Sequence, residues 1–187
     1  MAQKEELLRQ VFESVDETLC ARIAQATADA ALRAMADDMS ERSGLCIFLH
    51  GDLGAGKTTW ARAFLRACGV RDRIRSPSFS VVESYQIPGM ALHHLDFYRQ
   101  SDPDAWQGGG LRDLIAERAI SLIEWPEKAE GLPEPDIDVR IDWQHEVSAD
   151  GPRRLEIRFL RHPGGTDLAG QLPAWQAATA SRTDHRS

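Results

Sequence analysis

The sequence predicts an α/β fold of three layers, in which helices cover both faces of a mixed β-sheet. Residues 45–49 and 119–123 are continuous apolar runs, which are typical of parallel strands buried on both faces. Two other regions alternate between apolar and polar residues and predict antiparallel hairpins beside that parallel core. The chain has 187 residues, of which 42% are hydrophobic, and this is enough for one sizeable core.

Three helices are predicted along the chain. Apolar residues at steps of three and four after Asp16 indicate an amphipathic helix that ends near residues 40–44, with Asp16 as its N-cap. Residues 58–68 have apolar positions at helical spacing, and Gly69 is placed to end that helix in a left-handed conformation. A short helix is expected over residues 111–117.

Each predicted hairpin consists of two alternating segments that flank a turn. The first comprises residues 79–85 and 91–98 around Pro88-Gly89, and the second comprises residues 137–143 and 154–160 around Asp150-Gly151. We expect the second hairpin to extend or edge the sheet.

The composition excludes several classes of function. A formal net charge of −7 gives no global positive field that would attract nucleic acid or an anionic membrane, so any RNA contact must be local or belong to a partner. The three cysteines lack metal-ligand spacing, and we interpret them as reduced core residues. Because no leader or membrane-spanning stretch is visible, we expect a cytoplasmic protein that does not bind membranes.

A glycine-rich turn lies between the strand at residues 45–49 and the helix that follows. It fits the pattern G-x-x-x-x-G-K-[ST], in which backbone N–H groups and the helix N-terminus surround phosphate oxygens. Lys57 would contact the β- and γ-phosphates, the Thr58 hydroxyl would coordinate magnesium, and Thr59 would support the loop or the α-phosphate. The predicted nucleotide-binding residues are Gly51, Asp52, Leu53, Gly54, Ala55, Gly56, Lys57, Thr58 and Thr59.

This turn predicts a P-loop NTPase-like fold with ATP and Mg²⁺ as ligands. We expect a single P-loop ATPase domain over residues 1–161 that includes the N-terminal helix. Residues 162–187 are rich in Gly, Ala, Thr and Arg without sustained periodicity, and they predict a partly disordered C-terminal extension.

Hydrolysis also requires a carboxylate near the phosphate loop, and the sequence offers two. Glu124 follows the second apolar run, where a strand should emerge beside the loop, although an ordinary charge at a strand end would look the same. Asp96 shares the polar face of an alternating strand with His94. His93 and His94 point to opposite faces of that strand, which argues against a shared metal ion.

Two further features adjoin these motifs. Trp125, next to Glu124, would form a lid over the core. Residues 76–80 contain three serines and would act as a switch that senses the γ-phosphate, or would simply form a turn.

Taken in order, four motifs resemble those of the TsaE (YjeE) family over about residues 16–160. They are H-G-D-L-G-A-G-K-T-T at residues 50–59, S-P-S-F-S at 76–80, H-L-D-F-Y-R at 94–99 and I-E-W-P-E-K at 123–128. The resemblance implies an ATPase required for threonylcarbamoylation of the adenosine next to the anticodon in tRNA. The implied partner is the TsaD-TsaB heterodimer, through which tRNA would be reached only indirectly.

The resemblance also implies roles for individual residues. Lys57 and Thr58 would bind phosphate and magnesium, and Asp96 and Glu124 would be the essential acids, with Lys57 and both acids catalytic. Thr58 and Glu124 would be the metal ligands, although the resemblance leaves open which acid contacts magnesium directly. Trp125 would lie close to the nucleotide. The sequence departs from the family pattern at Ser78, where threonine is more usual, and in the extension after Arg161.

Two other functions share the phosphate loop. A P-loop kinase for a small molecule would use Lys57, Thr58 and an acid, and would need a lid with arginines, which Arg71, Arg73 and Arg75 could supply. A nucleotide-sensing module would use ATP to stabilise a binding surface without needing hydrolysis.

Overall fold

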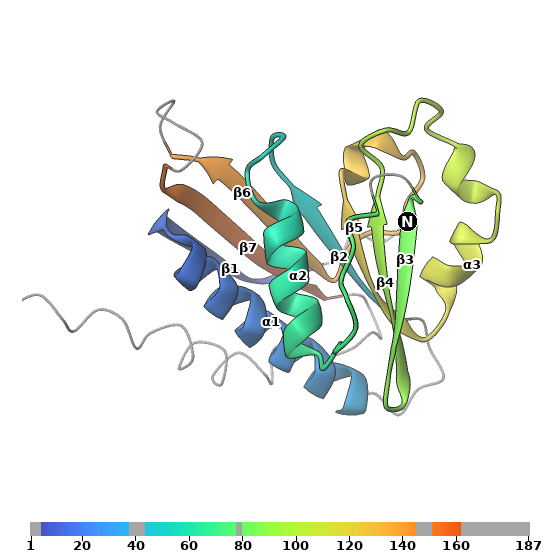
Figure 1. Ribbon diagram of the computed structural model, residues 1–187, viewed down its shortest axis with the longest axis horizontal. Coiled ribbons are helices and arrows are strands. Elements are labelled where there is room, and N and C mark those ends of the chain that lie inside the picture. Colours follow the sequence, from blue (N-terminus) through green and yellow to red (C-terminus); the bar gives the residue numbers. More distant parts are fainter. Residues whose placement is uncertain (1–4, 38–43, 78–79, 145–150, 162–187) are drawn as a thin grey trace, which may run out of the picture.

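The computed structural model describes residues 5–37, 44–77, 80–144 and 151–161, and within these ranges seven strands form one sheet (Figure 1). The strands are β1 (Glu5–Val15), β2 (Leu45–His50), β3 (Val82–Ile87), β4 (Met90–Asp96), β5 (Ala119–Glu124), β6 (Ile137–Trp143) and β7 (Arg153–Arg161). The helices are α1 (Glu17–Asp37), α2 (Lys57–Ala67) and α3 (Leu111–Ala116), with two 3₁₀ turns, η1 (Ala105–Gln107) and η2 (Pro126–Lys128).

The strand order is β1-β7-β6-β2-β5-β4-β3. The four central strands, β6, β2, β5 and β4, are mutually parallel, while β3, β7 and β1 pair antiparallel with their neighbours. Both predicted hairpins are present, as β3-β4 and β6-β7. The mixed sheet with a parallel core is therefore confirmed.

The apolar run of β2 faces two cores because strand side chains alternate between the faces of a sheet. Leu45, Ile47 and Leu49 belong to the larger core, which α1 and α2 cover. Cys46 and the partly buried Phe48 belong to a smaller core with residues of η1 and α3. Helices therefore lie on both faces, with α1 and α2 on one side of the sheet (Figure 1).

Several predicted boundaries are confirmed by specific contacts. The Leu19 amide donates to Asp16 Oδ1 at 2.7 Å, as an N-cap requires. Gly69 has a φ of 101° after α2, which is the left-handed conformation expected there. All three cysteines are free and buried.

Strand β1 was not predicted from the sequence, in which the first predicted element was the helix capped by Asp16. It pairs antiparallel with β7, but the register shifts between Glu6 and Leu8 and again between Phe12 and Val15. Each shift moves the following side chains to the other face, so the segment does not show the simple alternation that identifies a strand. The sheet was expected to be extended or edged by the β6-β7 hairpin. Instead β1 forms the edge next to β7, and the hairpin lies inside the sheet.

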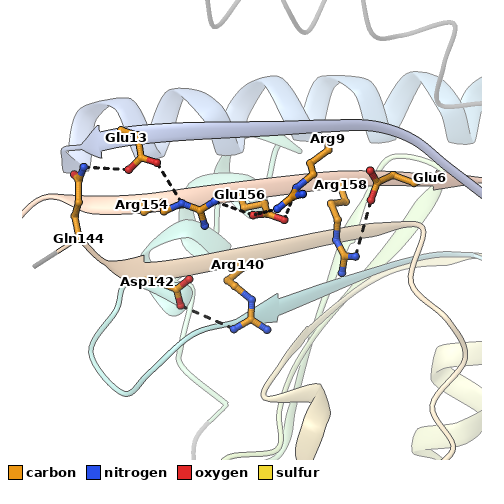
Figure 2. Close-up of polar contacts among 9 residues, drawn as sticks. All are labelled: Glu6, Arg9, Glu13, Arg140, Asp142, Gln144, Arg154, Glu156 and Arg158. Carbon is orange, nitrogen blue, oxygen red and sulfur yellow. Dashed lines mark hydrogen bonds and ion pairs between the residues drawn. The ribbon is translucent and has the colours of Figure 1, made fainter.

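Charged side chains line the face of β1, β7 and β6 that points away from the larger core (Figure 2). Arg9 forms a bidentate pair with Glu156 at 2.8 and 2.9 Å, and Arg154 bridges Glu156 and Glu13 at 3.1 and 3.2 Å. These pairs are partly exposed, so each contributes little to stability.

Some predicted segments lie outside the described residues. They are the extension at 162–187, the end of the first helix beyond Asp37, and Ser78 and Phe79 within the serine segment. Where the structure describes the chain, none of its helices combines the length and the hydropathy needed to span a bilayer.

Candidate nucleotide-binding site

The glycine-rich turn joins β2 to α2 and has the backbone shape of a phosphate loop. Gly51, Gly54 and Gly56 have φ values of 134°, 80° and 114°, a region that side chains disfavour. At Gly51 a Cβ atom would also lie 2.0 Å from the carbonyl oxygen of Ile141 on β6. Glycine is therefore required at Gly51 both by conformation and by the close approach of β6.

Lys57, the first residue of α2, has its ammonium group directed into this loop. Its Nζ atom donates to the carbonyl oxygens of Gly51 at 2.6 Å and Asp52 at 2.9 Å. The same atom lies 3.9 Å from the centroid of the Trp125 ring. Burial lowers the pKa of Lys57 from its usual value, although the surrounding carboxylates, Glu124 foremost, oppose this shift. The loop carbonyls and the indole ring thus hold a buried cation at the place where phosphate would bind.

Glu124, the last residue of β5, has both carboxylate oxygens engaged. Thr58 Oγ1 donates to Oε2 at 3.0 Å, and His94 Nε2 donates to Oε1 at 2.8 Å. Glu124 and His94 are 2% and 0% exposed, so this is a buried contact and not a solvated charge at a strand end. The other ring nitrogen of His94, Nδ1, is buried and has no hydrogen-bond partner among the described residues. His94 therefore orients Glu124 toward the N-terminus of α2.

Asp96 ends β4 directly beside Glu124, because the two residues are register partners in the parallel β4-β5 pair. Its Oδ1 atom accepts a 2.9 Å hydrogen bond from the Tyr98 amide. Burial raises the pKa of Asp96; the Tyr98 hydrogen bond opposes the shift, and the charge of Glu124 adds to it. The two acids named by sequence thus meet at one edge of the sheet, next to the phosphate loop.

Trp125 adopts a left-handed backbone conformation, with a φ of 56° that is unusual for a bulky residue. Its amide donates to the Leu49 carbonyl at 3.3 Å, and its ring lies 5.0 Å from the Tyr98 ring. This conformation turns the indole over Lys57. Trp125 therefore contacts the predicted phosphate-binding residues as well as the smaller core.

His50 is a site residue that the sequence reasoning quoted in a motif but gave no role. It immediately precedes Gly51, and its ring nitrogens lie 3.3 Å from Glu127 and 3.4 Å from Asp138. Burial disfavours the imidazolium, yet these two carboxylates outweigh it and raise the pKa of His50 to about 9. His50 thus ties the start of the loop to η2 and β6. Histidine next to the loop was visible in the sequence, but its partners come from distant segments.

A cavity of about 120 Å³ opens beside the end of the loop, away from Glu124. It is lined by Asp16, Glu17, Cys20, Ala55, Gly56, Thr59 and Arg153. Thr59 is therefore placed on the cavity side, whereas Thr58 points toward Glu124. The side chains of Asp52 and Leu53 are exposed, so these two residues offer the site mainly their backbone groups.

The described residues contain no cluster of three or more His, Cys, Asp or Glu side chains suited to a metal ion. His93 and His94 are adjacent on β4, and their side chains point to opposite faces of the sheet. His93 contacts Ser84 and Glu117, while His94 contacts Glu124 on the other face. Magnesium, by contrast, binds with few protein oxygens when phosphate oxygens and water complete its shell. Thr58 and Glu124 provide two suitable oxygens only 3.0 Å apart.

Known proteins are similar to this chain in sequence and in fold. Residues 23–154 match a family model described as "Threonylcarbamoyl adenosine biosynthesis protein TsaE". A Haemophilus influenzae protein named "tRNA threonylcarbamoyladenosine biosynthesis protein TsaE" is 42% identical over 114 residues, 60% of this chain and 69% of that protein. A Rickettsia bellii protein of the same name is 35% identical over 97 residues, 51% of this chain and 67% of that protein.

The crystal structure of Bacillus subtilis YdiB superposes with a TM-score of 0.62 at 23% identity, covering 95% of this chain and 98% of that one. This likeness confirms the P-loop NTPase-like fold. The family model covers more than half of the chain, and the chain spans more than two thirds of the Haemophilus protein. This chain therefore belongs to the TsaE family.

Proposed function

We propose that this protein binds and hydrolyses ATP with magnesium as a component of tRNA threonylcarbamoyladenosine biosynthesis. The observation that carries the proposal is the contact of Thr58, at the start of α2, with the buried Glu124 of β5. In P-loop ATPases a hydroxyl after the loop lysine and an acid from a neighbouring strand together hold magnesium. This arrangement is found in a chain that belongs to the TsaE family.

The phosphate end of ATP would occupy the loop. The backbone N–H groups from Gly54 to Thr58 and the amino end of α2 favour anionic oxygens. Lys57 would exchange its present acceptors, the carbonyls of Gly51 and Asp52, for β- and γ-phosphate oxygens. This exchange is favourable because a charged phosphate is a stronger acceptor for ammonium than a neutral carbonyl.

Thr58 and Glu124 would hold the metal. Magnesium bound there would neutralise charge on the phosphate oxygens during transfer. Because Glu124 Oε2 already faces Thr58 Oγ1, Glu124 is the acid that we assign to the metal or its water shell. Asp96, beside it in register, would position the attacking water.

The nucleoside would lie in the cavity at the other end of the loop. Gly56 and Thr59, which follow the phosphate positions of the loop, line one side of this cavity. Asp16 and Glu17 at the start of α1 and Arg153 of β7 also line it. Carboxylates at this place suit hydrogen bonds to ribose hydroxyls or to the amino group of a base.

We further propose that ATP hydrolysis serves the TsaD-TsaB heterodimer, which would modify the adenosine next to the anticodon. Family membership supports this assignment, and a cytoplasmic location follows from it because tRNA is the substrate. The single P-loop domain would comprise residues 1–161.

The test measures phosphate release from ATP by the purified full chain, with and without magnesium and with and without TsaD-TsaB. We expect slow magnesium-dependent release that rises when the heterodimer is added. Lys57→Ala should lower the rate of phosphate release by about 100-fold or more, since it deletes the cation of the loop. If the rate of ATP turnover is unchanged by the heterodimer but rises when a small phosphoryl acceptor is added, the protein is a kinase instead.

A further inference from the structure

A local excess of positive charge interrupts this acidic chain. Residues 62–75 contain five arginines and one acid, Asp72, so the segment carries a charge of 5 − 1 = +4, whereas the whole chain carries −7. All five arginine side chains are exposed. We call this set the arginine surface: Arg62, Arg66, Arg71, Arg73 and Arg75.

Two consecutive segments of the chain carry these residues. Arg62 and Arg66 are one turn apart on the exposed side of α2. After α2 the chain reverses at Gly69, and residues 70–77 run back beside the helix toward the end of the sheet that carries the phosphate loop (Figure 1). The arginine surface therefore spans α2 and the segment next to it.

Residues 70–77 are anchored to the rest of the domain by buried side chains and a hydrogen bond. Val70 and Ile74 are buried in the larger core, and the Arg75 amide donates to the Tyr85 hydroxyl at 3.1 Å. With Ile74 directed inward, Arg73 and Arg75 on either side of it are directed outward. The guanidinium groups thus project from an anchored backbone.

The arginine surface lacks internal charge compensation. Within the described ranges, Arg62, Arg71, Arg73 and Arg75 form no ion pair, and Arg66 donates to the Val70 carbonyl at 2.6 Å. The opposite situation holds on the outer face of β1, β7 and β6, where Arg9, Arg154 and Arg158 are each matched by carboxylates (Figure 2). Like charges held together repel one another, so this surface favours an anionic ligand.

The arrangement of the cations identifies the class of ligand. Arg71, Arg73 and Arg75 alternate along their segment, and Arg62 and Arg66 are four residues apart on α2, which corresponds to a rise of about 6 Å. Several exposed guanidinium groups on neighbouring segments suit the repeated phosphates of one backbone, because arginine can donate two parallel hydrogen bonds to a phosphate. Acidic side chains of a folded protein have no such repeat. The ligand that fits is a nucleic-acid backbone.

We propose that the arginine surface binds the phosphate backbone of tRNA directly. The choice of tRNA among nucleic acids rests on the proposed function, whereas the contact between arginine and phosphate does not. The proposal revises the expectation that tRNA is reached only through partners, because a negative net charge excludes a global attraction but not a local one. Among the described residues, none of the five arginines contacts Lys57 or Glu124 or lines the cavity, so their replacement should leave ATP binding intact, contrary to the arginine lid that a kinase would need.

The experiment measures binding of a fluorescent, unmodified tRNA transcript to the purified full chain by anisotropy, at several salt concentrations and without TsaD-TsaB. The test variant is Arg71→Gln/Arg73→Gln/Arg75→Gln. The control, Arg9→Gln/Arg112→Gln/Arg140→Gln, changes the net charge equally but removes exposed arginines from β1, α3 and β6. Thermal unfolding and ATP binding are measured for every variant, so that a folding defect is recognised.

We expect wild-type binding to weaken steeply with salt. The test variant should bind about tenfold to a hundredfold more weakly, and its logarithmic salt slope should be smaller by about 2 to 3. The control should bind within about twofold of wild type. Equal loss in both variants, or no binding by wild type, would overturn the proposal.

Two further outcomes separate this inference from the proposed function. Affinity for TsaD-TsaB is measured in a separate binding assay. If the test variant loses that affinity while tRNA binding is unchanged, the surface docks a protein and the proposal is wrong. If tRNA binding behaves as expected but ATP is not hydrolysed, the arginine surface stands and the proposed ATPase function fails.

Discussion

Removing one partner from the buried contact between His94 and Glu124 should destabilise the folded protein by about 3 kcal/mol. The two residues are 0% and 2% exposed, and their Nε2 and Oε1 atoms are 2.8 Å apart. His94→Leu replaces the imidazole with an apolar side chain of moderate size, and it leaves Glu124 Oε1 without its donor. A buried charged acceptor left unpaired costs about 3 kcal/mol.

The single substitution also removes the unpartnered Nδ1 of His94, which offsets part of this cost. A double-mutant cycle isolates the interaction between the two side chains. Glu124→Leu alone should destabilise because it leaves the His94 donor buried and unpaired. The variant with both changes should lose about 1 to 3 kcal/mol less than the sum of the two, since no orphaned partner remains.

The assay is urea unfolding of the full chain without nucleotide, followed by fluorescence and circular dichroism. The matched control is a cycle on His93 and Glu117, an ion pair made by the adjacent histidine on the other face of β4. Because the Glu117 side chain is 45% exposed and can be rehydrated, the coupling there should stay below about 1 kcal/mol. Additive effects at His94 and Glu124, within about 0.5 kcal/mol, would refute the assignment of His94 as the residue that holds Glu124.

Three other changes test the remaining parts of the site. Because the pKa of His50 is raised to about 9 from 6.5, its stabilisation is complete below about pH 6.5 and is lost as the pH rises through 9. The free energy of unfolding of wild type should therefore fall between these pH values by up to about 3 kcal/mol more than that of His50→Gln, and parallel pH profiles would contradict this. Gly51→Ala should cost about 3 kcal/mol or more in urea unfolding, because it combines a φ of 134° with a clash, whereas Gly89→Ala has only the φ of 80° and should cost about 1 kcal/mol. Glu124→Ala should retain much of the affinity for ATP in calorimetry but lose at least 100-fold in hydrolysis, and equal loss of both would place Glu124 in ground-state binding.

Local sequence patterns predicted most of the architecture because they report local physics. The phosphate loop depends on glycines at defined positions, and the strand before it and the helix after it are visible as an apolar run and a helical period. The same holds for the hairpins and for the helix capped by Asp16. Strand β1 was missed because its two register shifts break the alternation on which strand prediction depends.

The candidate site was predicted residue by residue but not as a set of contacts. Glu124 and Asp96 were identified as acids at strand ends, and their proximity follows from the parallel register of β4 and β5. The role of His94 depends on that register as well, because the contact joins residues 30 positions apart. The ion pairs of His50 need η2 and β6, which no local pattern connects to the phosphate loop.

The fold class, the phosphate loop and the membership of the TsaE family can be inferred from the sequence, because they depend on residue types at short and regular spacing. Three features are visible only in the folded protein: the oxygen of Glu124 that faces Thr58, the contact of Trp125 with Lys57, and the exposure of the arginines on α2 and the following segment. Those features depend on strand order and on a reversal of the chain at Gly69. Distances between side chains remote in sequence are set by the packing of the whole domain.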